Sequence, residues 1–401
     1  MFFKDFRTFE TEVAGRKLVI ETGKMAGLAN GACLVRYGET EVLCTATMAP
    51  KAREGVDFFP LSVDFEEKLY AVGRIPGSFQ RREGKASEKA VLTSRVIDRP
   101  IRPLFPKDMR NDVSVVATVM SVDPDCSPEI AALWGVSTAI AISDIPWDGP
   151  VSSVSLGLVD GEYVINPTLE QRAKTEMTVT VASTDSLVAM IEAGANEISN
   201  EVMFDGIMFA HEENKKIVEF IKSIVAEIGR EKITFESNDP SEELYEAIKA
   251  FAIDDVKVAL DTDDKRIRDE RLAPIYDAVH AEFDEKFPEE AAKIDDCLYK
   301  LQKFIVRRWL LDEGKRVDGR GIDEIRPLNA QVDLLSRVHG SGMFTRGQTQ
   351  VLTVTTLGPV SDAQLLDGLD NEESKRYMHH YNFPAYSVGE TKPSRGPGRR
   401  E

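Results

Sequence analysis

The feature that most constrains this chain is an internal repeat. Residues 31–50 read GACLVRYGETEVLCTATMAP, and residues 340–359 read GSGMFTRGQTQVLTVTTLGP. Aligned without gaps, the two segments are identical at seven of twenty positions. In both, a Gly-polar-Thr turn leads into a β-branched run, a pattern typical of a hairpin that enters a buried strand. Coincidence between two β-rich segments is the alternative, but duplication of one domain is the more economical explanation.

The correspondence continues downstream. Residues 70–73 (YAVG) are followed after a loop by residues 81–83 (RRE), and residues 386–389 (YSVG) by residues 399–401 (RRE). The first copy continues to about Gly229, whereas the second stops at the end of the sequence. We therefore expect two copies of one domain, the second incomplete, in a fragment of a longer protein.

Hydrophobic periodicity predicts the elements between and within the copies. In the first copy we expect strands at 113–122, 177–182 and 203–210, a hairpin at Asp160-Gly161, a buried helix at 128–142, and an amphipathic helix at 212–228 ended by Gly229. Residues 240–311 instead carry apolar residues at helical spacing. Their two stripes are Leu244, Ile248, Phe251 and Ala252, and Leu298, Leu301, Ile305 and Trp309. The sequence therefore predicts an α+β chain with an all-helical insert between the copies.

The charge of the chain is segregated. The net charge is −18, yet residues 74–107 hold nine basic and three acidic side chains, and residues 239–296 hold nineteen acidic and eight basic ones. One stretch could face phosphates while the other is a solvated face. The overall sign therefore does not exclude nucleic acid.

The cysteines and the apolar runs indicate the compartment. Four scattered cysteines without a CxxC pair indicate reduced thiols and neither a disulfide framework nor a zinc site. The N-terminus lacks the apolar core of a signal peptide, and the longest nearly apolar run, 131–143, is too short to span a bilayer. We expect a cytoplasmic protein with no membrane partner.

The sequence lacks the motifs of several enzyme classes. The sequence has no GxxxxGK[ST] loop, no GxGxxG after a strand, no HExxH and no GxSxG, and its five histidines show no metal-ligand spacing. An ATPase, a dehydrogenase, a zinc hydrolase or a serine hydrolase is therefore disfavoured, and we expect no metal site within these residues.

A glycine-rich loop carries the first candidate site. Phe79 and the pair Arg81-Arg82 lie in GRIPGSFQRREGKAS, where an aromatic ring could stack on a base while guanidinium groups bind phosphates. The alternative is a surface loop with incidental charges, or arginines that pair with nearby acids. Three further basic residues favour a polyanion site; they are Arg95, Arg99 and Arg102.

The second copy repeats the arginine pair. Arg399 and Arg400 lie in TKPSRGPGRRE, where glycine and proline allow close approach of a ligand, and the arginine fork suits inorganic phosphate or a phosphodiester. Upstream, RVDGR at 316–320 suggests a tight turn whose arginines are held by local acids. We interpret that motif as mainly structural, with interface or RNA contact as the alternative.

These motifs resemble one family. RVDGRGIDEIRP, FTRGQTQVL, HHYNFPAYSVGET and GPGRRE resemble the second core of the polynucleotide phosphorylases, and GSFQRREGKASE with VIDRPIRPLFP resembles the first. The resemblance runs from about residue 5 to 401. It implies two ribonuclease-PH-like cores, the second incomplete, joined by an all-helical domain. The implied boundaries are 1–145 and 146–235 for the two lobes of the first core, 236–315 for the helical domain, and 316–401 for the start of the second core.

The family's activity follows as an implication. It implies 3′-to-5′ phosphorolytic degradation of single-stranded RNA in mRNA turnover, releasing nucleoside diphosphates and reversible to polymerisation. It also implies a homotrimeric ring with a central channel, inorganic phosphate as co-substrate, Mg²⁺, and proteins of an RNA-degradation complex as candidate partners.

The resemblance also assigns residues. Phe79, Arg81 and Arg82 match the family's RNA-gripping loop, in which Gln80 replaces a second phenylalanine and weakens stacking. Arg399 and Arg400 match the phosphate site. The catalytic serine loop, the two metal-binding aspartates with their lysine, and the KH and S1 domains are expected beyond Glu401.

The first core is not expected to replace that site. It has Cys126-Ser127-Pro128 where the active core has its serine run, and Arg172, Thr178 and Thr180 where two aspartates and a lysine are needed. Such side chains cannot hold Mg²⁺, which binds carboxylate oxygens. We therefore predict that the fragment alone is inactive. A non-catalytic RNA-binding or assembly scaffold is the alternative; a single-core ribonuclease PH is disfavoured, because it would need no helical insert.

Overall fold

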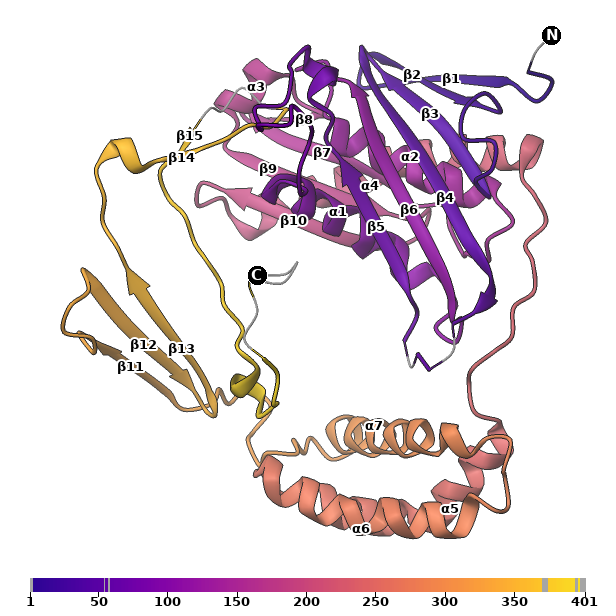
Figure 1. The fold of residues 1–401 in the computed structure, drawn as a ribbon, viewed down its shortest axis with the longest axis vertical. Coiled ribbons are helices and arrows are strands. Elements are labelled where there is room, and N and C mark those ends of the chain that lie inside the picture. The colour runs from indigo at the N-terminus through magenta and orange to yellow at the C-terminus, as the bar shows by residue number, and fades with distance from the viewer. Residues whose placement is uncertain (1–2, 54, 57, 370–373, 394–395, 397–401) are drawn as a thin grey trace. The chain divides into compact units, whose positions relative to one another are not determined.

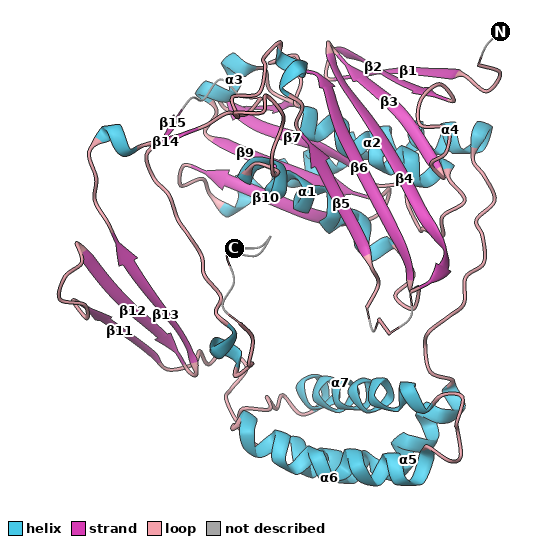
Figure 2. Ribbon diagram, in the orientation of Figure 1, coloured by secondary structure: helices cyan, strands magenta, loops and turns pink. Residues whose placement is uncertain are grey.

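A computed structural model describes residues 3–53, 55–56, 58–369, 374–393 and 396. The chain divides into two compact units, one formed by Met1–Ser237 with Ala363–Glu401 and the other by Asn238–Asp362. The first unit is mixed α/β, and the second combines helices with a small sheet (Figures 1 and 2). No helix in the described part of the chain is both long and apolar enough to cross a membrane.

A six-stranded sheet begins the first unit. Its order is β1 (Arg7–Val13), β2 (Arg16–Thr22), β3 (Gly31–Tyr37), β4 (Thr40–Ala52), β6 (Asn111–Ser121) and β5 (Leu61–Glu66). Neighbours are antiparallel except β5 and β6, which are parallel and connected through helix α1 (Glu88–Ile101). A parallel pair needs such a crossover. The arginine-containing loop therefore leaves the carboxyl end of β5 and leads into α1.

A four-stranded sheet with helices completes the first core. Its order is β10 (Val188–Ala195), β9 (Met177–Ser183), β7 (Ser152–Val159) and β8 (Glu162–Ile165). The short helix α3 (Leu169–Lys174) follows β8, and the long helix α4 (Asn200–Ile228) packs on β7 and β9. The predicted hairpin is confirmed: Asp160 and Gly161, both at positive φ, join β7 to β8.

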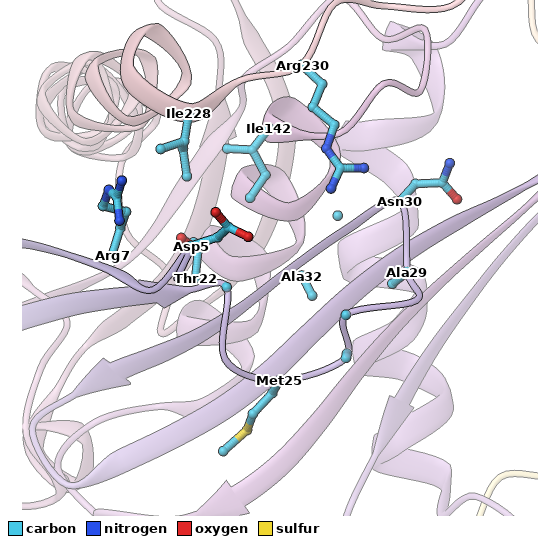
Figure 3. A pocket seen from close by; sticks show the side chains of 14 residues that line it. Asp5, Arg7, Thr22, Met25, Ala29, Asn30, Ala32, Ile142, Ile228 and Arg230 are labelled. Atoms are coloured by element: carbon cyan, nitrogen blue, oxygen red, sulfur yellow. The ribbon is translucent and has the colours of Figure 1, made fainter. Parts of the chain in front are cut away.

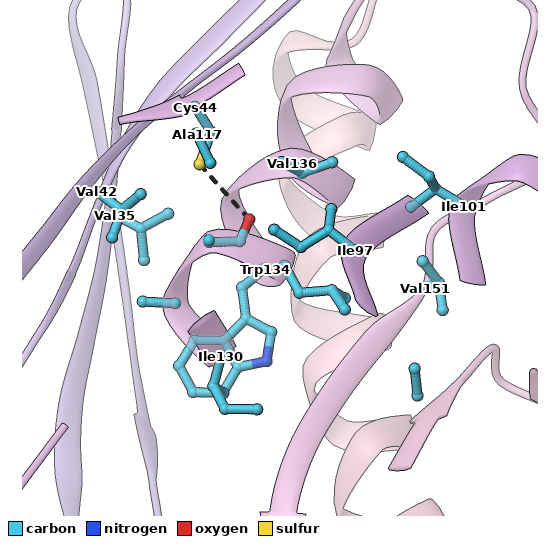
Figure 4. Packing of buried hydrophobic residues seen from close by; sticks show 14 of the residues in the cluster. Val35, Val42, Cys44, Ile97, Ile101, Ala117, Ile130, Trp134, Val136 and Val151 are labelled. Atoms are coloured by element: carbon cyan, nitrogen blue, oxygen red, sulfur yellow. Dashed lines mark hydrogen bonds between the residues drawn. The ribbon is translucent and has the colours of Figure 1, made fainter. Parts of the chain in front are cut away.

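Helix α2 (Pro128–Ile142) is the centre of the core. Every residue from 130 to 142 is buried, because α2 contacts β3, β4 and β6 as well as β7 and α4. A helix that is apolar all round needs such an environment. Figure 4 shows Trp134 among its aliphatic neighbours, and its indole N–H donates to the carbonyl of Ser153 at 2.7 Å. The prediction of a buried helix at 128–142 is confirmed.

The strand predicted at 203–210 is wrong. These residues belong to α4, which begins at Asn200, twelve residues before the predicted start of the amphipathic helix. The hydroxyl of Ser199 accepts the N–H of Val202 at 3.3 Å and caps the helix. Gly229 lies at the predicted end, but with φ −64° it is extended and not left-handed. The secondary structure of the apolar run at 203–210 was ambiguous from the sequence, because a short apolar run can be buried either in a helix or in a strand.

The second unit contains the predicted helical insert. Its helices are α5 (Glu242–Leu260), α6 (Lys265–Phe283) and α7 (Ile294–Asp312), which share one hydrophobic cluster. The predicted stripe on α7 is buried. On α5, Leu244, Ile248 and Ala252 of the predicted stripe are buried, whereas Phe251 is 49% exposed. A small antiparallel sheet follows, of β11 (Leu328–Val332), β12 (Gly340–Arg346) and β13 (Thr349–Thr355).

The two copies share local geometry. In β3–β4, residues 31–37 pair with 46–40, and in β12–β13 residues 340–346 pair with 355–349, so the registers are identical under the sequence alignment. The short helices η1 (Leu69–Val72) and η5 (Ala385–Val388) both end at a left-handed glycine, Gly73 and Gly389. The duplication predicted from sequence is therefore visible element by element.

The remaining elements are short. They are η2 (Arg102–Leu104), η3 (Ala291–Lys293), η4 (Val360–Asp362), β14 (Gln364–Leu365) and β15 (Ser374–Lys375). Strands β14 and β15 pair with each other in the first unit.

Candidate nucleic-acid interface

The loop between β5 and α1 is anchored at both ends. Gly73 caps η1 with φ 70°, a conformation that glycine adopts without strain, and its N–H bonds back to the carbonyl of Leu69. Further along, the carboxylate of Glu83 accepts the N–H of Leu69 at 3.3 Å. The hydroxyl of Ser87 accepts the N–H of Ala90 at 2.9 Å and starts α1. The loop is thus closed on itself at its base.

The tip of the loop is a compact turn that presents four exposed side chains. The hydroxyl of Ser78 donates to the carbonyl of Arg82 at 2.7 Å and accepts its N–H at 3.2 Å. Arg81 lies at φ 54°, in the left-handed region. Phe79 is fully exposed, at 102% of its reference area, and Gln80, Arg81 and Arg82 are exposed as well.

Neither arginine of the tip is neutralised within the described parts of the chain. Arg81 reaches only the carbonyl of Pro76, at 3.5 Å, and Arg82 has no ion pair there. Among the described residues, no acid holds either arginine, so this part of the chain does not support the alternative in which nearby acids pair with them. The tip offers one aromatic ring and two guanidinium groups without an ion pair among the described residues, which suits stacking on a base and binding of phosphates.

The neighbouring arginines have different surroundings. Arg102 forks onto the carboxylate of Asp98, with its nearest nitrogen at 2.7 Å, and also donates to the carbonyl of Leu61 at 3.1 Å. Arg99 pairs with Glu192 of β10. These two arginines therefore hold α1 to the two sheets, and Arg95 alone of the three predicted helpers is exposed without such a partner in the described residues.

A cavity of about 180 Å³ lies in the first core and is lined by several of the residues that the sequence resemblance aligns with catalytic positions. Its lining includes Ser127, Arg172 and Thr180, as aligned, together with Asp125, Glu129 and Asn166. Thr178 is exposed two residues before Thr180 on β9 and does not line it. Sequence reasoning missed Asn166, whose only local signal was the turn-forming Asn166-Pro167 pair.

The charges of this cavity are balanced by fixed partners. The ammonium of Lys89 lies 2.9 Å from Glu129. Burial is the largest single influence on Glu129 and raises its pKa, but the positive charge of Lys89 together with hydrogen bonds from Ser127 and Lys89 outweighs burial, so the pKa of that carboxyl is lowered. The guanidinium of Arg172 donates to the carbonyl of Pro124.

The cavity does not fit a divalent metal. Mg²⁺ needs carboxylate oxygens, and Arg172, Ser127 and Thr180 supply a cation and two hydroxyls instead. The two carboxylates of the lining already have partners, since Asp125 accepts the N–H of Leu169 and Glu129 pairs with Lys89. Across the residues that the structure describes, no group of three or more His, Cys, Asp or Glu side chains could hold a metal ion. We therefore derive no catalytic step through a metal in this chain.

A second cavity, of about 350 Å³, lies beside the loop between β2 and β3 (Figure 3). Asp5, Arg7 and Arg230 are its charged lining residues, and Ile142 and Ile228 are apolar ones. Arg7 is 3.9 Å from Glu227. No sequence motif indicated this cavity, because its lining comes from four separate segments.

The motif at 316–320 has the predicted turn, and its arginines are held by a local acid. Asp318 accepts Arg320 at 2.8 Å and Arg326 at 3.3 Å, and Arg316 lies 3.8 Å away. The hydrogen bond from Arg320 is the main cause of a lowered pKa at Asp318. Gly319, at φ 72°, forms the predicted turn. Arg399 and Arg400, the expected phosphate ligands, lie outside the described residues.

Comparison with protein-family models matches nearly the whole chain. The model of the 3′ exoribonuclease family, domain 1, matches twice, at residues 14–146 and 324–401, and domain 2 of that family matches at 149–213. The model described as polyribonucleotide nucleotidyltransferase, RNA binding domain, matches residues 243–321. The chain belongs to the 3′ exoribonuclease family and, within it, to the polyribonucleotide nucleotidyltransferases. The double match of domain 1 also confirms the repeat.

Curated relatives support the same family assignment. The chain is 60% identical to a polyribonucleotide nucleotidyltransferase of Ruminiclostridium cellulolyticum over 99% of its length, and 58% and 54% identical to those of Lachnoclostridium phytofermentans and Clostridioides difficile. It spans only 56–57% of the length of these relatives. Among solved structures, rice (Oryza sativa) Rrp46 is similar with a TM-score of 0.42 and 14% identity, over 56% of this chain and 95% of that one.

Proposed function

We propose that the whole protein degrades single-stranded RNA from the 3′ end by phosphorolysis and that residues 1–401 provide its RNA-entry half. The main support for this proposal is the tip of the β5–α1 loop. There Phe79, Arg81 and Arg82 are exposed, and the two arginines have no ion pair among the described residues. In this proposal the ring stacks on a base and the guanidinium groups hold successive phosphates. Phosphate then attacks the terminal phosphodiester, and a nucleoside diphosphate leaves; the reverse reaction extends the RNA.

Further parts of the proposal concern the second core and assembly. Arg399 and Arg400 would hold the attacking phosphate. The Mg²⁺ of the reaction would have to be held by groups that the described residues do not supply. We also propose a homotrimer in the cytoplasm, with proteins of an RNA-degradation complex as partners.

The proposed domains are the two lobes of the first core at 1–145 and 146–235, the helical domain at 236–315, and the beginning of the second core at 316–401. Two observations support this division. The match to domain 1 ends at residue 146 and the match to domain 2 begins at 149, and the RNA-binding-domain model matches residues 243–321.

Removing the two arginines of the tip tests the RNA-binding role. We expect Arg81→Ala with Arg82→Ala to weaken binding of a fluorescein-labelled oligo(A) and to flatten the slope of log K against log salt by about 1.4, because each lost phosphate contact removes about 0.7 on single strands. Lys215→Ala with Lys216→Ala is the matched control, since these exposed cations pair with Glu212 and Glu213 on α4. An unchanged slope in the arginine variant would show that the loop is ordinary surface.

A non-catalytic RNA-binding scaffold is the second candidate. The observation in its favour is the first-core cavity, in which Arg172 and Thr180 stand at aligned catalytic positions and cannot bind a metal. Phosphate-dependent release of nucleoside diphosphates by the full-length protein would decide for the enzyme, and RNA binding without any release would decide for the scaffold.

A further inference from the structure

A short hairpin formed by β14 and β15 is an addition to the second copy. Gln364 pairs with Lys375, and Leu365 pairs with Ser374. The chain needs 27 residues from Pro359 to Tyr386, but only 20 between the equivalent positions of the first copy. The hairpin lies in this longer stretch, so the repeat itself does not require it.

The hairpin contacts the limb that leads to the tip of the RNA-binding loop. A carboxylate oxygen of Asp367 accepts the N–H of Gly77 at 3.2 Å, and the guanidinium of Arg74 donates to the carbonyl of Gly368. A Cβ atom on Gly77 would lie 3.0 Å from that Asp367 oxygen, so a larger residue at this position would require the carboxylate to shift by a few tenths of an ångström.

Two more contacts fix the hairpin on the first core. The ammonium of Lys375 lies 2.7 Å from Glu88, in the first turn of α1, where the loop ends. Leu369 is only 8% exposed and belongs to the hydrophobic cluster of the first core. The hairpin therefore holds the entry limb through Arg74 and Gly77 and contacts the exit of the loop through Glu88.

We propose that the hairpin residues 364–369 and 374–375 position the RNA-binding loop, with Asp367 as the main positioning residue. Phe79, Arg81 and Arg82 follow Gly77 by only two to five residues, so the orientation of that limb sets where their side chains point. A loop held in its binding conformation loses less conformational entropy when RNA binds, and its affinity is higher. The inference rests on the proposed function of the loop and adds that a segment of the second copy determines how tightly the first core holds RNA.

Replacing Asp367 tests the proposal in the 401-residue chain. We expect Asp367→Ala to weaken oligo(A) binding roughly three- to tenfold, the worth of one hydrogen bond, and to accelerate hydrogen exchange at the amide of Gly77. Asp362→Ala is the control, because this nearby exposed carboxylate forms no ion pair with a described residue. If Asp367→Ala binds oligo(A) with unchanged affinity, the proposal is overturned, whether hydrogen exchange at the amide of Gly77 becomes faster or stays slow.

A charge swap gives an independent readout that misfolding cannot imitate. Lys375→Glu and Glu88→Lys should each weaken RNA binding, and the double swap should restore it because the ion pair forms again in reverse. Failure of the double swap to recover affinity would contradict positioning by this contact. If Arg81→Ala with Arg82→Ala leaves RNA binding unchanged, the proposed RNA-binding function of the loop is wrong. If the arginine variant weakens binding but the hairpin variants do not, the loop binds RNA and only the positioning role of the hairpin is wrong.

Discussion

Gln80 separates the exposed ring of Phe79 from the two arginines of the tip and is itself exposed. Its amide offers little stacking surface, whereas an aromatic ring at this position could stack on a second base. We predict that Gln80→Phe tightens binding of oligo(A) by about 1–3 kcal/mol, the usual worth of one stacked base, and leaves the salt slope unchanged. Fluorescence anisotropy at several salt concentrations measures both, with Gln80→Ala as control. Equal affinities for Gln80→Phe and Gln80→Ala would refute stacking at the tip.

His280, on α6, gives a pH dependence to the helical domain. Its Nδ1 lies 2.9 Å from Asp284 and its Nε2 lies 3.1 Å from Asp295, and these hydrogen bonds raise the pKa of His280 above 6.5. A raised pKa in the folded state means that the stabilisation is complete below pH 6.5 and is lost as the pH rises through the folded value. His280→Gln should therefore lower the melting temperature more at about pH 6 than at about pH 9. An equal loss at both pH values would exclude the charged histidine as the cause.

At the scale of elements, α2 is fixed against β3 and β4 by a glycine. A Cβ on Gly135 would lie 2.5 Å from the sulfur of Cys44 and 2.8 Å from a methyl of Val35. Gly135→Ala should therefore lower the free energy of unfolding, because overpacking costs roughly 1–3 kcal/mol and exceeds the helix-propensity gain of at most about 1 kcal/mol. Gly194→Ala in β10 meets no atom within 4 Å and should change the stability little. Denaturant titration of both variants measures the difference, and a stabilised Gly135→Ala would show that α2 can move.

For the whole molecule, the prediction concerns catalysis. Arg172 and Thr180, which the sequence resemblance aligns with catalytic positions, line the first-core cavity, and no described group of three or more His, Cys, Asp or Glu side chains could hold a metal ion. The purified 401-residue chain should therefore bind oligo(A) but release no nucleoside diphosphate from poly(A) in the presence of phosphate and Mg²⁺. Thin-layer chromatography of labelled products measures release. Phosphate-dependent diphosphate above background would contradict this assignment of roles.

The sequence by itself determined the features that are local. The buried helix α2, the hairpin at Asp160-Gly161, the helical insert and the duplicated strand pairs follow from periodicity, turn residues and self-similarity, which nearby residues carry. The same reasoning failed at 203–210, where an apolar run fitted helix and strand equally well and the cap at Ser199 decided.

Only the tertiary structure decided which charged groups are free to act. Arg81 and Arg102 look alike in the sequence, but Arg102 forms an ion pair with Asp98, while Arg81 has no ion pair among the described residues. The first-core cavity and the contact of Asp367 with Gly77 also join segments far apart in the chain. Such contacts depend on packing between distant elements, and no local pattern of residues encodes them.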